Sequence, residues 1–122
     1  MLKKKLFWLL IFLFIIVVLY FYFLNPSENR SYFLPCFFYE ITGYQCPGCG
    51  SQRAFHELLH FHFLAATKQN LLFVLGIPYV LAAIFFNLKK KKYPKMNEFL
   101  LGNRTLLVLL VIVILFGVFR NL

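Results

Sequence analysis

The chain has no aspartate, and its only acidic residues are four glutamates among 122 residues. Mechanisms that use paired aspartates, or a histidine oriented by an aspartate, are therefore excluded. Charged residues of either sign make up 14% of the sequence and hydrophobic residues 61%, against about 25% and about 45–50% in a soluble domain. The composition is therefore not that of a soluble globular protein.

Positive charge predominates, because thirteen Lys and Arg residues against four acids give a formal net charge of +9. Such a charge suits either nucleic acid or an anionic membrane surface. Eight of the cations stand beside long apolar runs, at the level expected for lipid headgroups. We therefore predict a lipid bilayer as the main partner and no nucleic acid. The predicted membrane-surface residues are Lys3, Lys4, Lys5, Lys89, Lys90, Lys91, Lys92 and Lys95.

The first apolar run, residues 6–24, contains no charged residue. Its nineteen residues would form a helix about 28 Å long, which matches the roughly 30 Å hydrocarbon core of a bilayer. The run ends in aromatic side chains followed by Asn25 and Pro26, where a signal peptide would carry small residues before a cleavage site. We therefore predict a retained transmembrane helix that ends before Pro26.

Two further apolar runs follow in the second half of the chain. Residues 71–88 contain Pro78, which kinks a helix but is tolerated in membrane helices. Residues 105–119 are few for a bilayer, and they reach full length only if their helix begins near Phe99 and continues through Gly102. The three runs together predict an all-α membrane protein with about three transmembrane helices.

The runs divide the chain into three predicted regions. Residues 1–24 form a basic stub and the first transmembrane helix, residues 25–69 a Cys/His loop with an amphipathic helix, and residues 70–122 two transmembrane helices joined by a Lys-rich loop. The stub and the lysines of residues 89–95 are separated by two spans, so they lie on one side, which the positive-inside rule makes cytoplasmic. The Cys/His loop is then extracytoplasmic, where thiols tend to oxidise.

Residues 25–69 hold all three cysteines and all three histidines. Proline and glycine interrupt the first half of this region, so we predict loops and short turns there. Residues 51–68 contain neither, and they are predicted to form one amphipathic helix that lies against the ends of the membrane spans. Ser51 is the predicted N-cap of this helix.

The sequence Cys46-Pro47-Gly48-Cys49-Gly50, here called the knuckle, brings two thiols together across a tight turn. Such a turn can supply ligands for zinc, carry a redox-active or structural dithiol, or be a turn without chemistry. A four-ligand zinc site needs more than two thiols, so a third cysteine and a histidine would have to complete it. The predicted knuckle-site residues are Cys36, Cys46, Pro47, Cys49, Gly50 and Arg53.

A polar stripe is expected on the helix that follows the knuckle. If the helix extends back to Cys49, then Cys49, Arg53, His56 and His60 fall within an arc of about 60°. The two histidines can bind one metal ion or can be ordinary polar residues of an exposed face. Arg53 can bind a phosphate or carboxylate group, or it can hold the knuckle through loop carbonyls. The predicted metal ligands are Cys36, Cys46, Cys49, His56 and His60.

Three cysteines are an odd number, so one disulfide would leave a thiol free, bound to another chain or bound to metal. A bridge from Cys36 to the knuckle would be structural, whereas a bridge between Cys46 and Cys49 would be of the kind that redox proteins cycle. Cys49, close to a helix N-terminus and to Arg53, is expected to have a lowered thiol pKa. The sequence leaves these pairings open.

The cysteine-bearing segment resembles a family of small bacterial membrane proteins catalogued as a domain of unknown function. The resemblance covers about residues 35–78 and rests on a Cys, a Thr-Gly pair and the pattern C-P-x-C-G-x-x-R-A. The sequence departs from the family at Phe61-His62 and at Leu71, where Gly-Asp and Pro are usual. The resemblance implies a multi-span protein of the bacterial inner membrane and no established activity. The matching residues are Cys36, Thr42, Gly43, Cys46, Pro47, Cys49, Gly50, Arg53, Ala54, Ala66 and Asn70.

The sequence contains no complete catalytic constellation, so we predict a non-enzymatic membrane component whose knuckle forms a structural or binding site. One alternative is zinc binding through the three cysteines and a histidine. The other is extracytoplasmic thiol-disulfide exchange at Cys46 and Cys49. Three spans bury little surface on one another, so a homo-oligomer or a membrane partner protein is also expected.

Overall fold

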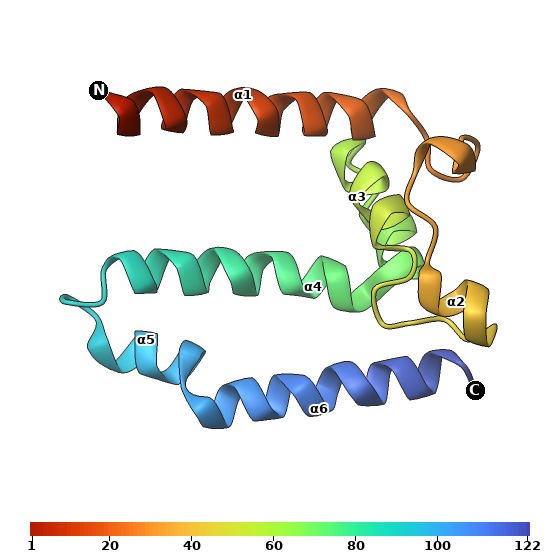
Figure 1. Cartoon of the computed structure of the whole chain (residues 1–122). Helices are drawn as coiled ribbons and strands as arrows, with labels where there is room; N and C mark the ends of the chain where they lie inside the picture. The colour runs from red at the N-terminus through yellow and green to blue at the C-terminus, as the bar shows by residue number, and fades with distance from the viewer.

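The computed structural model describes all 122 residues, and it contains helices and loops but no strand (Figure 1). This confirms the all-α fold class. The helical segments, in chain order, are α1 (Leu2–Phe23), the 3₁₀ helix η1 (Arg30–Tyr32), α2 (Phe37–Thr42), α3 (Ser51–Leu59), α4 (Phe63–Leu88), α5 (Pro94–Leu101) and α6 (Asn103–Arg120).

Three parts of the chain are helical, long and apolar enough to cross a membrane: α1, α4, and the segment that α5 and α6 form together. The chain runs along them in alternating directions, so the N-terminus and the Lys-rich turn after α4 lie at one end (Figure 1). The knuckle and the C-terminus lie at the other end. Five residues of 122 are buried, so the apolar surfaces of these helices face outward, as expected for helices in contact with lipid.

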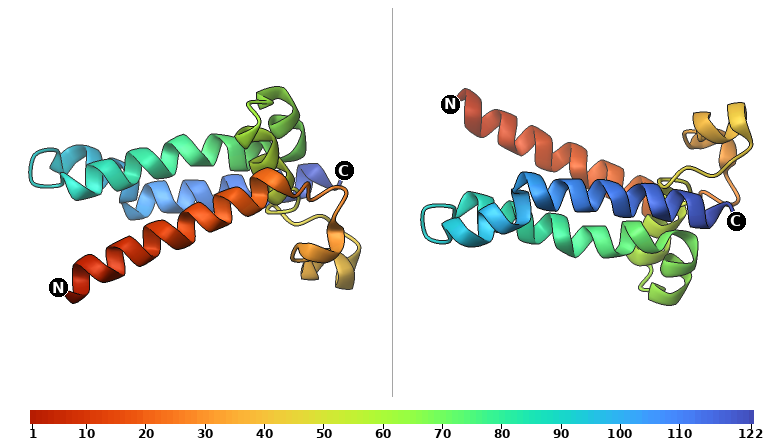
Figure 2. Two further views of the ribbon diagram at one scale, coloured as in Figure 1. Left: turned by 90° about the horizontal axis from the view of Figure 1, so that it is seen from above. Right: turned by 90° about the horizontal axis from the view of Figure 1, so that it is seen from below.

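Helix α1 ends where the sequence predicts, because Leu24 leaves the helical conformation just before Asn25 and Pro26. The last turn of α1 packs on α3, with the rings of Phe21 and Phe55 5.2 Å apart. Toward its N-terminus α1 diverges from α4 and α6 (Figure 2). The first span is therefore held to the rest of the molecule at the knuckle end.

The prediction of one helix over residues 51–68 is wrong, because α3 ends at Leu59 and α4 begins at Phe63. Phe61 adopts a left-handed conformation, with φ of 60°. The Phe61 N–H donates to the Leu58 carbonyl, and the N–H of the next residue to the Glu57 carbonyl. This is a Schellman motif, which usually has Gly at the left-handed position. Because this position is Phe and not Gly, the sequence does not indicate that the helix ends here.

The continuous helix from Phe99 through Gly102, on which the full length of the third run would depend, does not form. Gly102 is extended, with φ of −66° and ψ of 152°, and separates α5 from α6. A Cβ atom at Gly102 would lie 2.4 Å from the Glu98 carbonyl oxygen, so the chain can turn this tightly only at glycine. Helix α6 instead begins at Asn103, and its 18 residues extend about 27 Å.

Candidate metal centre

The knuckle is a pair of overlapping turns that leads into α3. The Cys49 N–H donates to the Cys46 carbonyl at 3.0 Å, and the Ser51 N–H donates to the Gly48 carbonyl at 3.1 Å. Gly50 is left-handed, with φ of 81°, and is the N-cap of α3, one residue before the predicted cap. Cys49 therefore lies in the turn and not on the helix, so the predicted stripe does not extend back to it.

The thiol of Cys36 meets the two thiols of the knuckle. The Sγ atoms of Cys36 and Cys46 are 3.2 Å apart, those of Cys46 and Cys49 3.1 Å, and those of Cys36 and Cys49 2.9 Å. No pair forms a disulfide. The three Sγ atoms, here called the thiol cluster, are placed so that they can hold one metal ion.

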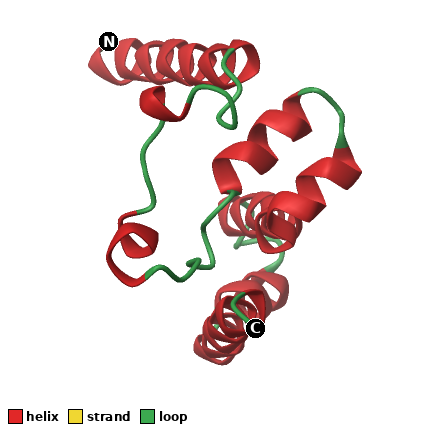
Figure 3. Ribbon diagram, turned by 90° about the vertical axis from the view of Figure 1, so that its right-hand side faces the viewer, coloured by secondary structure: helices red, strands yellow, loops and turns green.

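Cys36 reaches the knuckle because of the loop that carries it. It is the N-cap of the short helix α2, and Gly43, with φ of 75°, ends that helix and turns the chain back toward the knuckle. Figure 3, which looks at this end of the molecule, shows α2 between two loop segments. The thiol cluster thus joins the loop after α1 to the turn before α3.

The thiols influence one another's protonation. Burial raises the pKa of the Cys36 thiol, but hydrogen bonds from the other two thiols and from backbone N–H groups outweigh this and lower it to about 7. Burial and the hydrogen bonds with Cys36 and Cys46 raise the pKa of Cys49 to about 12. The predicted lowering at Cys49 is therefore wrong. One proton leaves the cluster easily, whereas further negative charge is unfavourable unless a cation balances it.

Asn70 attaches the knuckle to α4. Its side chain is 2% exposed, and its Nδ2 donates to the carbonyl oxygens of Pro47 at 2.9 Å and Cys49 at 3.2 Å. Its Oδ1 accepts the Phe73 N–H at 3.0 Å. The backbone of Asn70 is not helical, with φ of −158° and ψ of 96°, and this break in α4 turns the side chain toward the knuckle. The resemblance included Asn70 but implied no role for it.

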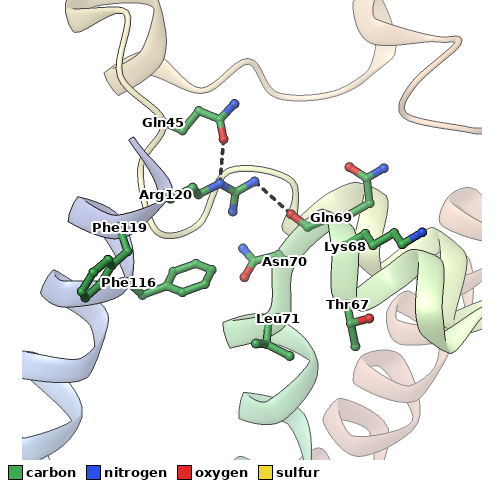
Figure 4. Close-up of a pocket in the computed structure, with 9 residues that line it drawn as sticks. All are labelled: Gln45, Thr67, Lys68, Gln69, Asn70, Leu71, Phe116, Phe119 and Arg120. Carbon is green, nitrogen blue, oxygen red and sulfur yellow. Dashed lines mark hydrogen bonds between the residues drawn. The ribbon is translucent and has the colours of Figure 1, made fainter. Parts of the chain in front are cut away.

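The C-terminal end of α6 holds the knuckle from another side (Figure 4). Arg120 donates through Nε to Gln45 Oε1 at 2.7 Å and through Nη2 to the Gln69 carbonyl at 2.9 Å. Asn121 accepts the backbone N–H of Gln45 at 2.7 Å and donates to its carbonyl at 2.8 Å. These residues could not be predicted, because nothing in the sequence relates a polar group at the end of one span to a loop 76 residues away.

Two glycines allow this close approach. A Cβ atom at Gly50 would lie 2.7 Å from the Gln69 carbonyl oxygen, so the knuckle backbone lies directly on α4, next to its break at Asn70. A Cβ atom at Gly117 would lie 2.9 Å from the ring of Pro47, so the knuckle also packs on α6. Ala54 and Ala66 are fully buried where α3 packs on α4.

The structure does not bring His56 and His60 to the thiol cluster. His56 Nδ1 donates to the Phe21 carbonyl at 2.6 Å, and His60 Nδ1 donates to the His56 carbonyl at 2.9 Å. The His60 ring stacks on Tyr22 of α1, with the ring centroids 4.5 Å apart. In this arrangement the two histidines belong to the contact between α1 and α3. The side chain of Arg53 makes no hydrogen bond to a loop carbonyl.

The lysines predicted to lie at the membrane surface are exposed. Lys3, Lys4 and Lys5 begin α1, and the lysines of residues 89–95 lie in and just after the turn that follows α4. Both groups are at the end of the molecule away from the thiol cluster (Figure 1).

Residues 36–84 match a family described as "Protein of unknown function (DUF2752)". This segment contains the thiol cluster, α3 and most of α4, and the match confirms the resemblance seen in the sequence. No curated protein and no solved structure matches the chain.

Proposed function

We propose that this chain, whose residues 36–84 belong to the DUF2752 family, is a non-enzymatic membrane protein whose thiol cluster binds one zinc ion. The observation that carries the proposal is the mutual contact of three thiols, with every Sγ–Sγ distance between 2.9 and 3.2 Å. A disulfide would need only two of these thiols. A thiophilic cation uses all three and balances their negative charge.

The geometry is close to that of a zinc site. Zn–S bonds of about 2.3 Å in a tetrahedral arrangement place the sulfur atoms about 3.8 Å apart. The cluster would therefore open by less than about 1 Å on binding zinc. Cys36 lies at the start of a six-residue helix between loops, so small shifts there disturb little packing.

Three protein ligands leave one position on the ion open. His56 and His60, the fourth ligands considered from the sequence, are engaged with α1. The open position would be taken by water or by an external ligand, because the cluster lies in the wall of a cavity. A site of this kind can bind, store or transfer a metal without catalysing a reaction.

Metal analysis of the purified protein tests the proposal. Protein extracted in a mild detergent, without chelator, should contain one zinc ion per chain. Replacing Cys36, Cys46 or Cys49 by Ser should each remove most of it, because two remaining thiolates bind zinc far more weakly than three. The matched control is His56→Ala, which should retain the metal. Reduced thiols with no bound metal would overturn the proposal.

A second candidate is thiol-disulfide exchange at Cys46 and Cys49, and the 3.1 Å separation of their Sγ atoms favours it. A thiolate attacks the partner's disulfide, forms a mixed disulfide and releases the partner's other sulfur as a thiolate; a neighbouring thiol then displaces the partner. Counting free thiols separates the candidates. Alkylation in acid-quenched cells, followed by denaturation with chelator and intact mass, should give three adducts for the metal site. One adduct would indicate a disulfide.

The proposed location is the inner membrane of a bacterium, with a cytoplasmic N-terminus and the thiol cluster outside. Support comes from the lysines, because eight of the nine, all except Lys68, lie at the end opposite the cluster. An impermeant thiol reagent should label the reduced, metal-depleted cluster in intact cells. Labelling only after lysis would indicate the opposite orientation, with the thiol cluster in the cytoplasm. Because α1, α4 and α6 bury little surface on one another, we also propose a homo-oligomer or a membrane partner protein.

A further inference from the structure

A cavity of about 760 Å³ lies between the loop after α1 and the knuckle. Its wall contains the three thiols of the cluster and three arginine side chains, Arg30, Arg53 and Arg120. Cavities that bind small organic ligands are usually about 300–1,000 Å³ in volume. This cavity therefore has room for more than an inorganic ion.

The charge of the wall is predominantly positive. Glu40 is the only acidic residue that lines the cavity, against three arginines. None of these arginines forms an ion pair, since the only one in the protein joins Glu57 to His62, outside the cavity. Three guanidinium groups around one space, without paired carboxylates, repel one another and attract an anion.

Hydrogen-bond donors also remain free in this wall. Arg120 lines the cavity, but its Nε and Nη2 donate to Gln45 and to the Gln69 carbonyl. The side chains of Arg53 and Arg30 have no hydrogen-bond partner in the protein. Guanidinium donors that have no partner in the protein can donate to an anion with several oxygen atoms, and such charge-assisted hydrogen bonds are stronger than neutral ones.

We infer that this cavity binds a molecule that carries a phosphate group. The planar fork of a guanidinium group matches phosphate oxygens in pairs, and several such groups around one anion give a strong site. Pro26, just after α1, and Arg120, at the end of α6, both line the cavity, so it lies near the level of lipid headgroups. The phosphate is therefore carried either by a lipid headgroup or by a water-soluble molecule.

Isothermal titration calorimetry on the metal-free full chain in maltoside detergent tests this inference. The probes are inorganic phosphate and monomeric dihexanoyl phosphatidic acid. Both should bind the wild type. Arg53→Gln and Arg30→Gln should each weaken binding about tenfold or more, as expected for one charge-assisted hydrogen bond. Arg104→Gln, which removes an exposed arginine at the opposite end, should change nothing.

The outcomes separate the sources of phosphate and the two proposals. Tighter binding of phosphatidic acid than of phosphate supports a lipid headgroup, and equal binding supports a soluble ligand. Cys36→Ser should lose zinc and still bind phosphate, so either proposal can fail alone. Absence of binding to the wild type would overturn the inference. Unchanged affinity in both Arg53→Gln and Arg30→Gln would overturn it as well. Because Arg30 is exposed, its replacement should leave the fold intact.

Discussion

The Lys-rich turn after α4 and the knuckle end of the molecule are held together by different interactions. At the Lys-rich end, the turn after α4 is closed by bonds between near neighbours, such as the Tyr93 N–H to the Lys89 carbonyl at 3.0 Å. At the knuckle end, polar side chains join residues that are 21 to 76 positions apart. Apolar composition is enough to place helices in a membrane, whereas assembling a site requires specific long-range hydrogen bonds.

Among the variants considered, Asn70→Ala should destabilise the knuckle end most. The substitution leaves the Pro47 and Cys49 carbonyls and the Phe73 N–H without the buried side chain that pairs with them. We expect the free energy of unfolding to fall by about 3–4 kcal/mol. SDS-induced unfolding from maltoside micelles measures it. Asn87→Ala, in the exposed last turn of α4, is the control, and an equal loss in both variants would refute the role given to Asn70.

A pair of glycine substitutions tests the contact between the knuckle and α4. Gly50 and Gly43 both have positive φ, but only a Cβ at Gly50 would meet another segment, 2.7 Å from the Gln69 carbonyl. Gly43→Ala should cost about 1 kcal/mol of backbone strain. Gly50→Ala should cost about 2–3 kcal/mol, because strain and collision add. Equal losses in the same unfolding assay would show that the close approach contributes nothing.

A second glycine pair probes the contact of the knuckle with α6. A Cβ at Gly117 would lie 2.9 Å from the Pro47 ring, whereas a Cβ at Gly76 in α4 would meet nothing within 4 Å. Gly117→Ala should lower the free energy of unfolding by about 1 kcal/mol. Gly76→Ala should be neutral or stabilising by up to about 1 kcal/mol, because alanine favours helix. A stabilising Gly117→Ala would contradict the packing of Pro47 on α6.

Replacing Lys90, Lys91 and Lys92 together by Gln should have the smallest effect. These side chains are exposed and pair with no carboxylate, so the free energy of unfolding should change by about 0.5 kcal/mol or less. Zinc content should stay the same. A loss of stability as large as that of Asn70→Ala would mean that the Lys-rich turn contributes as much to stability as the long-range hydrogen bonds of the knuckle end.

Much of the site was predictable because its chemistry is local in the sequence. The spacing of Cys46 and Cys49 around Pro47 requires a turn that brings two thiols together. The contribution of Cys36 was anticipated only as one of several options, because its position depends on how residues 37–45, which include α2, fold. The histidines were assigned to the metal on helical spacing alone, but α3 begins only at Ser51, after Cys49, and the histidines instead contact α1.

The amino-acid sequence by itself determined the three apolar helices, the approximate end of the first one, and the clustering of lysines at one end. These features follow from hydrophobicity and charge, which act residue by residue. Tertiary structure alone decided that Asn70, Arg120 and Asn121 hold the knuckle and that three arginines surround one cavity. Such contacts depend on where distant segments meet, and a helix break of one residue, as at Asn70 or Gly102, redirects everything that follows it.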